Sequence, residues 1–185
     1  MEETVRWKMD GRSRTIAFAF IGSGVVGVGV LSFAAGILGI RINTSYSLPL
    51  GLYIGTHDSA APLIEFCPTG TFAQQSSERG YRAASFACAD GAVPLLKPIV
   101  ATEGDLVETS PAGIRVNGVL LPQTAPLHRD GRSRPLEPWP FGTYRVKPGT
   151  VWVASTYNRG SYDSRYMGPI AVSQICRRLK PLWVR

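Results

Sequence analysis

The hydrophobic positions of this 185-residue chain fall into two contrasting regions. From Thr15 to Ile40, 26 consecutive residues contain neither a charged residue nor a proline. A helix of that length extends about 39 Å, which exceeds the roughly 30 Å of a bilayer's hydrocarbon core. After Ile40 the apolar residues occur in short runs without a sustained 3.6-residue period. The pattern predicts one transmembrane helix over 15–40 and a mostly β domain of ordinary size over 41–185.

An alternative for the apolar segment is a cleaved signal peptide, because Ser32-Phe33-Ala34 is similar to a small-x-small cleavage site. Its apolar region would then run for twenty residues from Thr15, which is longer than the usual range of about 7 to 15. We therefore favour an anchor that remains attached to the domain.

The charges that flank the apolar segment predict its orientation. Four basic residues precede it: Arg6, Lys8, Arg12 and Arg14. Only Arg41 lies within twenty residues after it. Since basic residues are retained on the inner side of a membrane, we expect a cytoplasmic segment over 1–14 and a translocated domain over 41–185. In a bacterium the chain would be a single-pass inner-membrane protein with its domain in the oxidising periplasm.

Short alternating runs in the second region predict antiparallel strands. Residues 114–121 carry two such runs around an Asn-Gly pair, which is the strongest short signal for a hairpin. Residues 144–154 carry two similar runs around Lys-Pro-Gly and predict a second hairpin. Two further strands are expected over 95–100 and 106–107. The stretches 69–89 and 122–140 are rich in small or polar residues and are expected to be exposed excursions.

Composition and charge exclude two classes of function. With two His, three Cys and no C-x-x-C pair, the sequence lacks the ligands of a standard zinc site. The formal charge is +7, and after residue 40 it is +6, from 16 bases and 10 acids, without a nucleic-acid recognition motif. We expect neither a metal, nor a cofactor, nor a nucleic-acid partner. Basic residues near the C-terminus are expected to face anionic lipid or solvent: Arg177, Arg178, Lys180 and Arg185.

A periplasmic location would allow the cysteines to form a disulfide, because that compartment is oxidising. Cys67 and Cys88 lie 21 residues apart on either side of a polar insertion and form a candidate disulfide. Closing a loop of this size would stabilise the fold by roughly 3 kcal/mol. Cys176 is left over, and we expect it to be a small buried hydrophobic residue rather than a reactive thiol.

Candidate chemistry begins with Ser47, just after the apolar segment. Pro49 disfavours helical backbone at the residue before it, Leu48. We therefore expect Ser47 to lie in extended or turn backbone, with its hydroxyl exposed to a partner. Its apolar neighbours would enter the membrane surface or flank a substrate cleft: Leu48, Leu50, Leu52 and Tyr53. An ordinary turn serine is the alternative.

A second segment holds one lysine in an apolar run. Lys97 shares a strand face with Leu95 and Ile99. Pro94 and Pro98 cannot donate ladder hydrogen bonds, so an edge strand or a bulge is predicted. Deprotonating an ordinary lysine at pH 7 costs roughly 4.6 kcal/mol, which desolvation in an apolar site can supply. The neutral amine could then accept a serine proton, whereas the alternative is a surface lysine with a solvated head group.

The third segment is the turn-rich run 158–169. Asp163 and Arg165 are two residues apart, so in extended backbone they face the same way and are expected to pair. Ser161 lies on the same side. A solvated surface loop is the alternative.

In this order, the three segments resemble the type I signal peptidases. The matching motifs are Asn-x-Ser-x-Ser47-x-Pro-x-Gly-Leu-Tyr, Leu-Leu-Lys97-Pro-Ile-Val-Ala-x-x-Gly-Asp and Ser161-x-Asp163-Ser-Arg165-Tyr-x-Gly-Pro. The resemblance extends from about Arg41 to Trp183 and is strongest to the TraF-type peptidases of conjugative plasmids. It implies a signal-peptidase-like antiparallel β domain.

The resemblance also implies a role for each residue. Ser47 would be the nucleophile and Lys97 its general base. The Ser47 N–H and the Ser45 hydroxyl would stabilise the oxyanion. Three residues of the third segment would orient the amine or brace the loop: Ser161, Asp163 and Arg165. The geometry of the Ser161 loop stays open, because residues 156–159 read Thr-Tyr-Asn-Arg where the housekeeping enzymes have Gly-Asp-Asn-Arg.

The implied activity is serine endopeptidase cleavage of a membrane-held pilin precursor with small residues before the cut. The acyl-enzyme would be resolved by water or by the substrate's own terminal amine, which would give a cyclic pilin. Other proteins of the mating apparatus are expected partners. Two alternatives are a general type I signal peptidase and a non-catalytic, membrane-anchored assembly subunit of that apparatus.

Overall fold

A computed structural model of the chain describes residues 39–185. The expected cytoplasmic segment and all but the end of the expected transmembrane helix lie outside the described residues. Ile40, which we assigned to the end of that helix, lies in strand β1 (Ile40–Asn43). Between residues 39 and 185 the longest helix has nine residues, and none combines the length and apolar character that crossing a bilayer requires.

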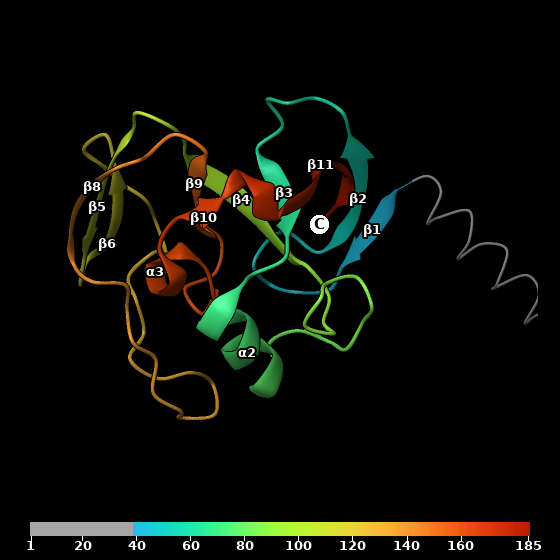
Figure 1. The fold of residues 1–185 in the computed structure, drawn as a ribbon, viewed down its shortest axis with the longest axis horizontal. Coiled ribbons are helices and arrows are strands. Elements are labelled where there is room, and N and C mark those ends of the chain that lie inside the picture. Colours follow the sequence, from blue (N-terminus) through green and yellow to red (C-terminus); the bar gives the residue numbers. More distant parts are fainter. Residues whose placement is uncertain (1–38) are drawn as a thin grey trace, which may run out of the picture. The chain divides into compact units, whose positions relative to one another are not determined.

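The larger of two sheets has seven strands in the order β1-β2-β11-β3-β4-β9-β10 (Figure 1). The pairings from β2 through β10 are antiparallel. After β1, the strands of this sheet have these bounds: β2 Gly51–Thr56, β3 Leu63–Phe66, β4 Leu95–Ala101, β9 Thr150–Val153, β10 Ile170–Ala171 and β11 Ile175–Val184. The prediction of a mostly β, antiparallel domain is confirmed.

The smaller sheet has four strands in the order β7-β6-β5-β8. Its bounds are β5 Leu106–Ser110, β6 Gly113–Val116, β7 Val119–Leu120 and β8 Gly142–Arg145. The predicted Asn-Gly hairpin is confirmed: β6 pairs with β7, and Asn117 (φ 49°) and Gly118 (φ 82°) have the positive φ values of a type I′ turn.

The second predicted hairpin, over residues 144–154, is wrong. Strand β8 pairs with β5 in the smaller sheet, whereas β9 pairs with β4 and β10 in the larger one. The chain does turn after Lys147, where the Thr150 N–H donates to the Lys147 carbonyl at 3.2 Å. This turn carries the chain from one sheet to the other, because each flanking strand has a better partner elsewhere in the sequence.

The two stretches that we expected to be exposed excursions are both partly buried. Residues 69–89 contain a helix, α2 (Gly70–Glu78), which has only two buried residues and therefore shows no clear apolar period. Residues 122–140 contribute Thr124 and Leu136 to the interior. Both corrections matter for the site, because these stretches supply part of its wall.

Strand β4, which carries Lys97, lies inside the larger sheet, so the predicted edge position is wrong. Strands β3 and β9 pair on its two sides. The alternative of an irregular strand holds, since the register with β9 shifts between Ile99 and Ala101. Pro98 has no N–H to donate, but its carbonyl accepts the Ala154 N–H at 3.2 Å. An interior strand buries its side chains more completely than an edge strand.

One of three hydrophobic clusters packs next to the Ser47 turn. It consists of Leu48, Tyr53, Leu96 and Leu179. Of the four apolar neighbours that we expected to enter the membrane surface or flank a cleft, Leu48 and Tyr53 are buried in this cluster. The other two, Leu50 and Leu52, are partly buried. Burying such a side chain stabilises the fold by about 1.5 to 3 kcal/mol, so the cluster anchors the turn to the sheet.

The three cysteines lie close together. Cys67 and Cys88 form a disulfide with an S–S distance of 2.03 Å, which closes the excursion containing α2. Cys176 on β11 was expected to be buried, but it is exposed. Its Sγ atom lies 3.4 Å from Cys67 Sγ, because β11 runs beside β3 at this point.

Candidate active site

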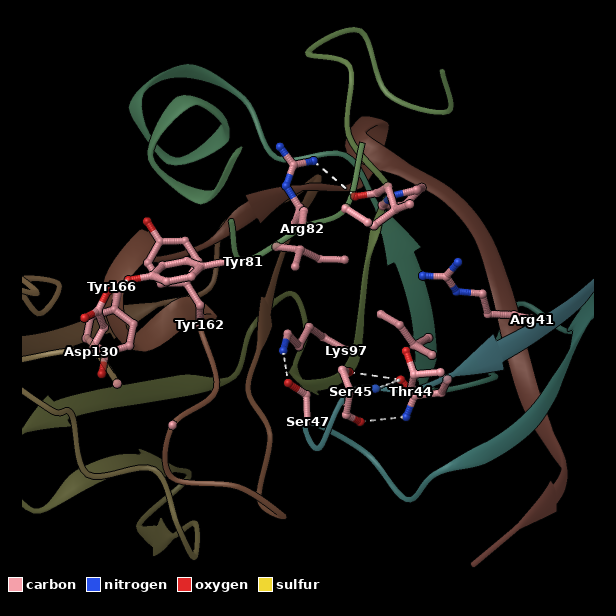
Figure 2. A pocket seen from close by; sticks show the side chains of 18 of the residues that line it. Arg41, Thr44, Ser45, Ser47, Tyr81, Arg82, Lys97, Asp130, Tyr162 and Tyr166 are labelled. Carbon is pink, nitrogen blue, oxygen red and sulfur yellow. Dashed lines mark hydrogen bonds between the residues drawn. The ribbon is translucent and has the colours of Figure 1, made fainter. Parts of the chain in front are cut away.

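Ser47 and Lys97 meet although they come from different elements. Ser47 lies in the turn between β1 and β2, and Lys97 lies in β4. Lys97 Nζ donates hydrogen bonds to Ser47 Oγ at 2.5 Å and to Ser161 Oγ at 2.7 Å. Figure 2 shows the Lys97 amine pointing at the Ser47 hydroxyl. When the amine is neutral, its lone pair is within reach of the Ser47 proton, which is the geometry of a nucleophile with its base.

The Lys97 amine is buried and easily deprotonated. The side chain is only 3% exposed, so it is not a surface lysine. Desolvation lowers the pKa of Lys97 from 10.5 to about 8; the Asp163 carboxylate opposes this and the Arg165 guanidinium adds to it. At pH 7 about a tenth of the amine is then neutral, and full deprotonation costs about 1.4 kcal/mol instead of nearly 5.

Asn43 organises the turn that presents Ser47. Its Nδ2 donates to the carbonyls of Ser45, Leu48 and Pro49 at 3.0, 3.2 and 3.0 Å. Its Oδ1 accepts the Ser45 N–H at 3.2 Å and the Ser45 hydroxyl at 2.9 Å. We gave Asn43 no role from the sequence, although an Asn that bonds to backbone two residues on is a recognised turn former.

The Ser45 hydroxyl lies on the wall of the same cavity as Ser47. Its proton points to Asn43 Oδ1, so it must rotate away before it can donate to an oxyanion. The predicted role of Ser45 as an oxyanion donor therefore stays a prediction.

Asp163 and Arg165 form a fully buried ion pair. Arg165 Nε donates to Asp163 Oδ1 at 2.8 Å and Nη2 donates to Oδ2 at 2.9 Å. Asp163 also caps the short helix α3 (Ser164–Met167) by accepting the Arg165 N–H. Arg165 Nη1 donates to the carbonyls of Arg159 and Gln123 at 2.7 and 2.9 Å. Residues 161–168 of the third segment are thus buried and form an interior brace rather than a solvated loop, whereas Arg159 and Gly160 are exposed.

Ser155 makes a further contact to Ser47 that sequence reasoning missed. Its buried hydroxyl donates to the Ser47 carbonyl at 2.6 Å. Only its position after a predicted strand end hinted at a special role, and a serine there is common. The partner of this hydroxyl lies 108 residues away, so no local pattern reveals the contact.

A cavity of about 460 Å³ opens beside Ser47 and Lys97. Its wall includes side chains from both misassigned excursions: Tyr81, Arg82, Leu127 and Leu136. Figure 2 shows Tyr81, Tyr162 and Tyr166 grouped apart from Ser47 and Lys97. The volume lies within the range of about 300 to 1,000 Å³ that is typical of ligand sites.

The acidic side chain of Asp130 lies on the cavity wall, and its carboxylate is already hydrogen-bonded. Asp130 on the cavity wall already accepts the Tyr81 hydroxyl at 2.6 Å and Arg134 Nε at 2.7 Å. In the described part of the chain, no group of three or more His, Cys, Asp or Glu side chains is placed to hold a metal ion.

The site is a serine hydroxyl in contact with a buried lysine amine on an antiparallel β frame. The family model described as signal peptidase, peptidase S26, matches residues 17–183. The chain therefore belongs to this signal peptidase family, and the resemblance drawn from its sequence is confirmed.

Its relatives include conjugation proteins. The plasmid transfer protein TraF of Escherichia coli is 39% identical over 173 residues, which cover 88% of this chain and 94% of that protein. The probable conjugal transfer protein TraF of Sinorhizobium fredii is 38% identical over 153 residues, covering 80% and 78%. Among solved structures, a signal peptidase I of Enterococcus faecalis V583 has a TM-score of 0.36 and 18% identity, over 68% of this chain and 98% of that one.

Proposed function

We propose that this chain is a membrane-anchored serine endopeptidase that processes a pilin precursor for conjugative transfer. The observation that carries the proposal is the 2.5 Å contact between the buried Lys97 amine and the Ser47 hydroxyl. The amine needs a lowered pKa to act as a base near neutral pH, and its burial provides one. The names of the TraF relatives support a role in conjugation.

The proposed reaction is acyl transfer in two steps. Neutral Lys97 takes the Ser47 proton while Oγ attacks the substrate carbonyl, and the Ser47 N–H stabilises the oxyanion. The Lys97 ammonium then gives its proton to the leaving amine, which leaves an acyl-enzyme on Ser47. Neutral again, Lys97 deprotonates the second nucleophile, either water or the substrate's terminal amine. Attack by this nucleophile releases the product and returns the proton to Ser47.

Location and partners belong to the same proposal. The 26-residue apolar run with its preceding bases supports a single pass through a bacterial inner membrane, with the N-terminus cytoplasmic and the catalytic domain periplasmic. The Cys67–Cys88 disulfide agrees with an oxidising compartment. Exposed Tyr46, Leu182 and Trp183 offer apolar contacts to the bilayer surface. The bound substrate would be a membrane-held precursor, alongside other proteins of the mating apparatus.

The test is co-expression of the full chain with a candidate pilin precursor, followed by mass measurement of the product. We expect Ser47→Ala and Lys97→Ala each to leave the precursor uncut, while both variants keep the circular dichroism spectrum of the unaltered chain. Matched controls are Ser173→Ala and Lys147→Ala, which change exposed residues and should process normally.

The outcome separates the alternatives. Unchanged processing in both dyad variants would support a non-catalytic assembly subunit and overturn the proposal. Cleavage of unrelated exported precursors with equal efficiency would support a general signal peptidase. A product that lacks one water relative to the trimmed linear peptide would show cyclisation.

A further inference from the structure

Ser155, the second residue after the end of β9, connects Ser47 to the rest of the site. Its side chain is fully buried, and its hydroxyl donates to the Ser47 carbonyl at 2.6 Å. The residue lies outside every motif by which the family resemblance was drawn. The contact is short for an O–H···O hydrogen bond, whose usual distance is about 2.7 to 2.8 Å.

The orientation of the Ser155 hydroxyl is fixed by its other partners. Its oxygen accepts the backbone N–H groups of Tyr157 and Asn158, each at 3.1 Å. A hydroxyl has two acceptor lone pairs and one proton. Since both lone pairs are occupied by N–H donors, the proton is left for the Ser47 carbonyl. The bond to Ser47 is therefore the single orientation that satisfies this buried group.

The backbone of Ser155 is held by the buried ion pair. Its N–H donates to Asp163 Oδ2 at 3.0 Å, and its carbonyl accepts Arg165 Nη2 at 3.0 Å. Every polar group of Ser155 is thus engaged. A continuous set of hydrogen bonds runs from Arg165 and Asp163 through Ser155 to Ser47.

Two consecutive residues link the base to the nucleophile. The Ala154 N–H donates to the carbonyl of Pro98, which directly follows Lys97. The Ser155 hydroxyl donates to the carbonyl of Ser47 itself. The Lys97 strand and the Ser47 turn are therefore fastened to one rigid stretch of backbone. Asn43 holds the turn internally, through its hydrogen bonds to the carbonyls of Ser45, Leu48 and Pro49.

We propose that Ser155 is a positioning residue for Ser47, which holds the nucleophile's peptide unit so that Oγ stays in line with the Lys97 amine. This inference rests on the proposed peptidase function. Fixing the Ser47 carbonyl fixes the rotation about the Cα–C bond of the residue that carries Oγ. Reacting groups that drift by about 1 Å lose on the order of 100-fold in rate.

The test compares three variants of the full chain in the precursor-processing assay. Ser155→Ala removes the hydroxyl, and we expect kcat to fall about 10- to 100-fold with KM within about twofold of the unaltered chain. Ser155→Thr keeps a hydroxyl and should recover kcat to within a few fold. If its thermal denaturation shows that threonine does not fit, Ser155→Cys replaces it, and partial recovery is expected from its weaker donor.

Asn158→Ala is the matched control for loop order. Asn158 Oδ1 accepts the Gly160 N–H at 2.8 Å, so it stabilises the loop that carries Ser161 without a side-chain contact to Ser47. We expect a loss of kcat below about threefold. An equal loss in Asn158→Ala and Ser155→Ala would overturn the inference, because loop order alone would then explain the effect.

The pH profile is the second readout. In Ser155→Ala the midpoint of kcat/KM against pH should stay where it is in the unaltered chain, since Lys97 remains buried and only the plateau falls. A midpoint displaced upward by a full pH unit would show general loosening around the amine and overturn the inference, as would an unchanged kcat. If Ser47→Ala also processes the precursor, the proposed function fails; if Ser47→Ala is inactive and Ser155→Ala fully active, only this inference fails.

Discussion

Lys97 Nζ and Ser47 Oγ lie 2.5 Å apart across fifty residues of sequence. The contact brings an amine from the interior of a sheet against a hydroxyl in a turn. Burial removes water from the amine, and the short distance places the Ser47 hydroxyl proton within reach of the lone pair of a neutral amine. The activity and the stability of the protein should therefore both depend on the charge of Lys97.

The first prediction concerns the pH dependence of cleavage. Only neutral Lys97 accepts the Ser47 proton, so kcat/KM should rise with pH and reach half its plateau near pH 8, the pKa of the amine. At pH 6 it should be about 100-fold below the plateau. Measuring kcat/KM for a precursor peptide between pH 6 and 10 tests this, with Lys147→Ala as a control that keeps the profile. A midpoint near 10.5 would contradict the burial of the amine.

The second prediction concerns stability. The pKa of Lys97 is lower in the folded chain, about 8, than its ordinary value of 10.5. Below pH 8 both states are protonated and the folded state bears the full desolvation cost, about 3 kcal/mol. This cost disappears as pH rises from 8 to 10.5. The free energy of unfolding of Lys97→Met should therefore exceed that of the unaltered chain by most at pH 7, and this difference should be smaller at pH 10.

Urea unfolding of both chains at the two pH values measures that difference. Lys147→Met, at an exposed position, serves as the control and should show no such change. A gain that is the same at pH 7 and pH 10 would count against a lowered Lys97 pKa.

The third prediction concerns the Asp163–Arg165 pair. Asp163→Asn keeps the shape of the side chain but leaves the Arg165 charge buried without a counter-charge. Removing one partner of a buried ion pair costs about 3 to 5 kcal/mol, so the free energy of unfolding should fall by that amount. Glu78→Gln, at an exposed position on α2, is the control, with an expected effect below about 0.5 kcal/mol. Equal unfolding midpoints for the two variants would refute the assignment.

The fourth prediction concerns Gly51, which follows the Ser47 turn. Its φ is +147°, and an added Cβ would lie 2.2 Å from the Trp183 carbonyl oxygen on β11. Gly51→Ala should therefore destabilise the domain by about 2 kcal/mol or more. Gly131→Ala, where an added Cβ meets nothing within 4 Å, should leave the unfolding midpoint nearly unchanged. Thermal unfolding of both variants compares them directly, and a normal midpoint for Gly51→Ala would exclude the close approach.

The fifth prediction concerns the cysteines. Cys88→Ser frees Cys67, whose Sγ lies 3.4 Å from that of Cys176. With oxidised glutathione as the oxidant, a Cys67–Cys176 disulfide should form and appear in a non-reducing peptide map. Cys176→Ser should keep the Cys67–Cys88 bond. If Cys67 and Cys176 can both still be alkylated after oxidation of Cys88→Ser, the two residues do not approach closely enough to form a disulfide.

Local sequence patterns correctly predicted structural features that depend on neighbouring residues alone. The hairpin at Asn117 and Gly118 follows from two residues that accept positive φ. The helix at Gly70–Glu78 was missed because only two of its residues are buried, which leaves no amphipathic period to read. The hairpin over 144–154 was wrong because strand pairing depends on partners that a local window does not contain.

The sequence by itself determined which residue types stand in which order: a serine before x-Pro, a lysine in an apolar run, and an Asp-x-Arg pair. That order was enough to assign the family. Only the tertiary structure decided that Lys97 is buried inside a sheet, that Asn43 ties the turn, and that Ser155 reaches Ser47. The physical reason is that desolvation and hydrogen bonding act through space, between groups that lie as far as 108 residues apart in the chain.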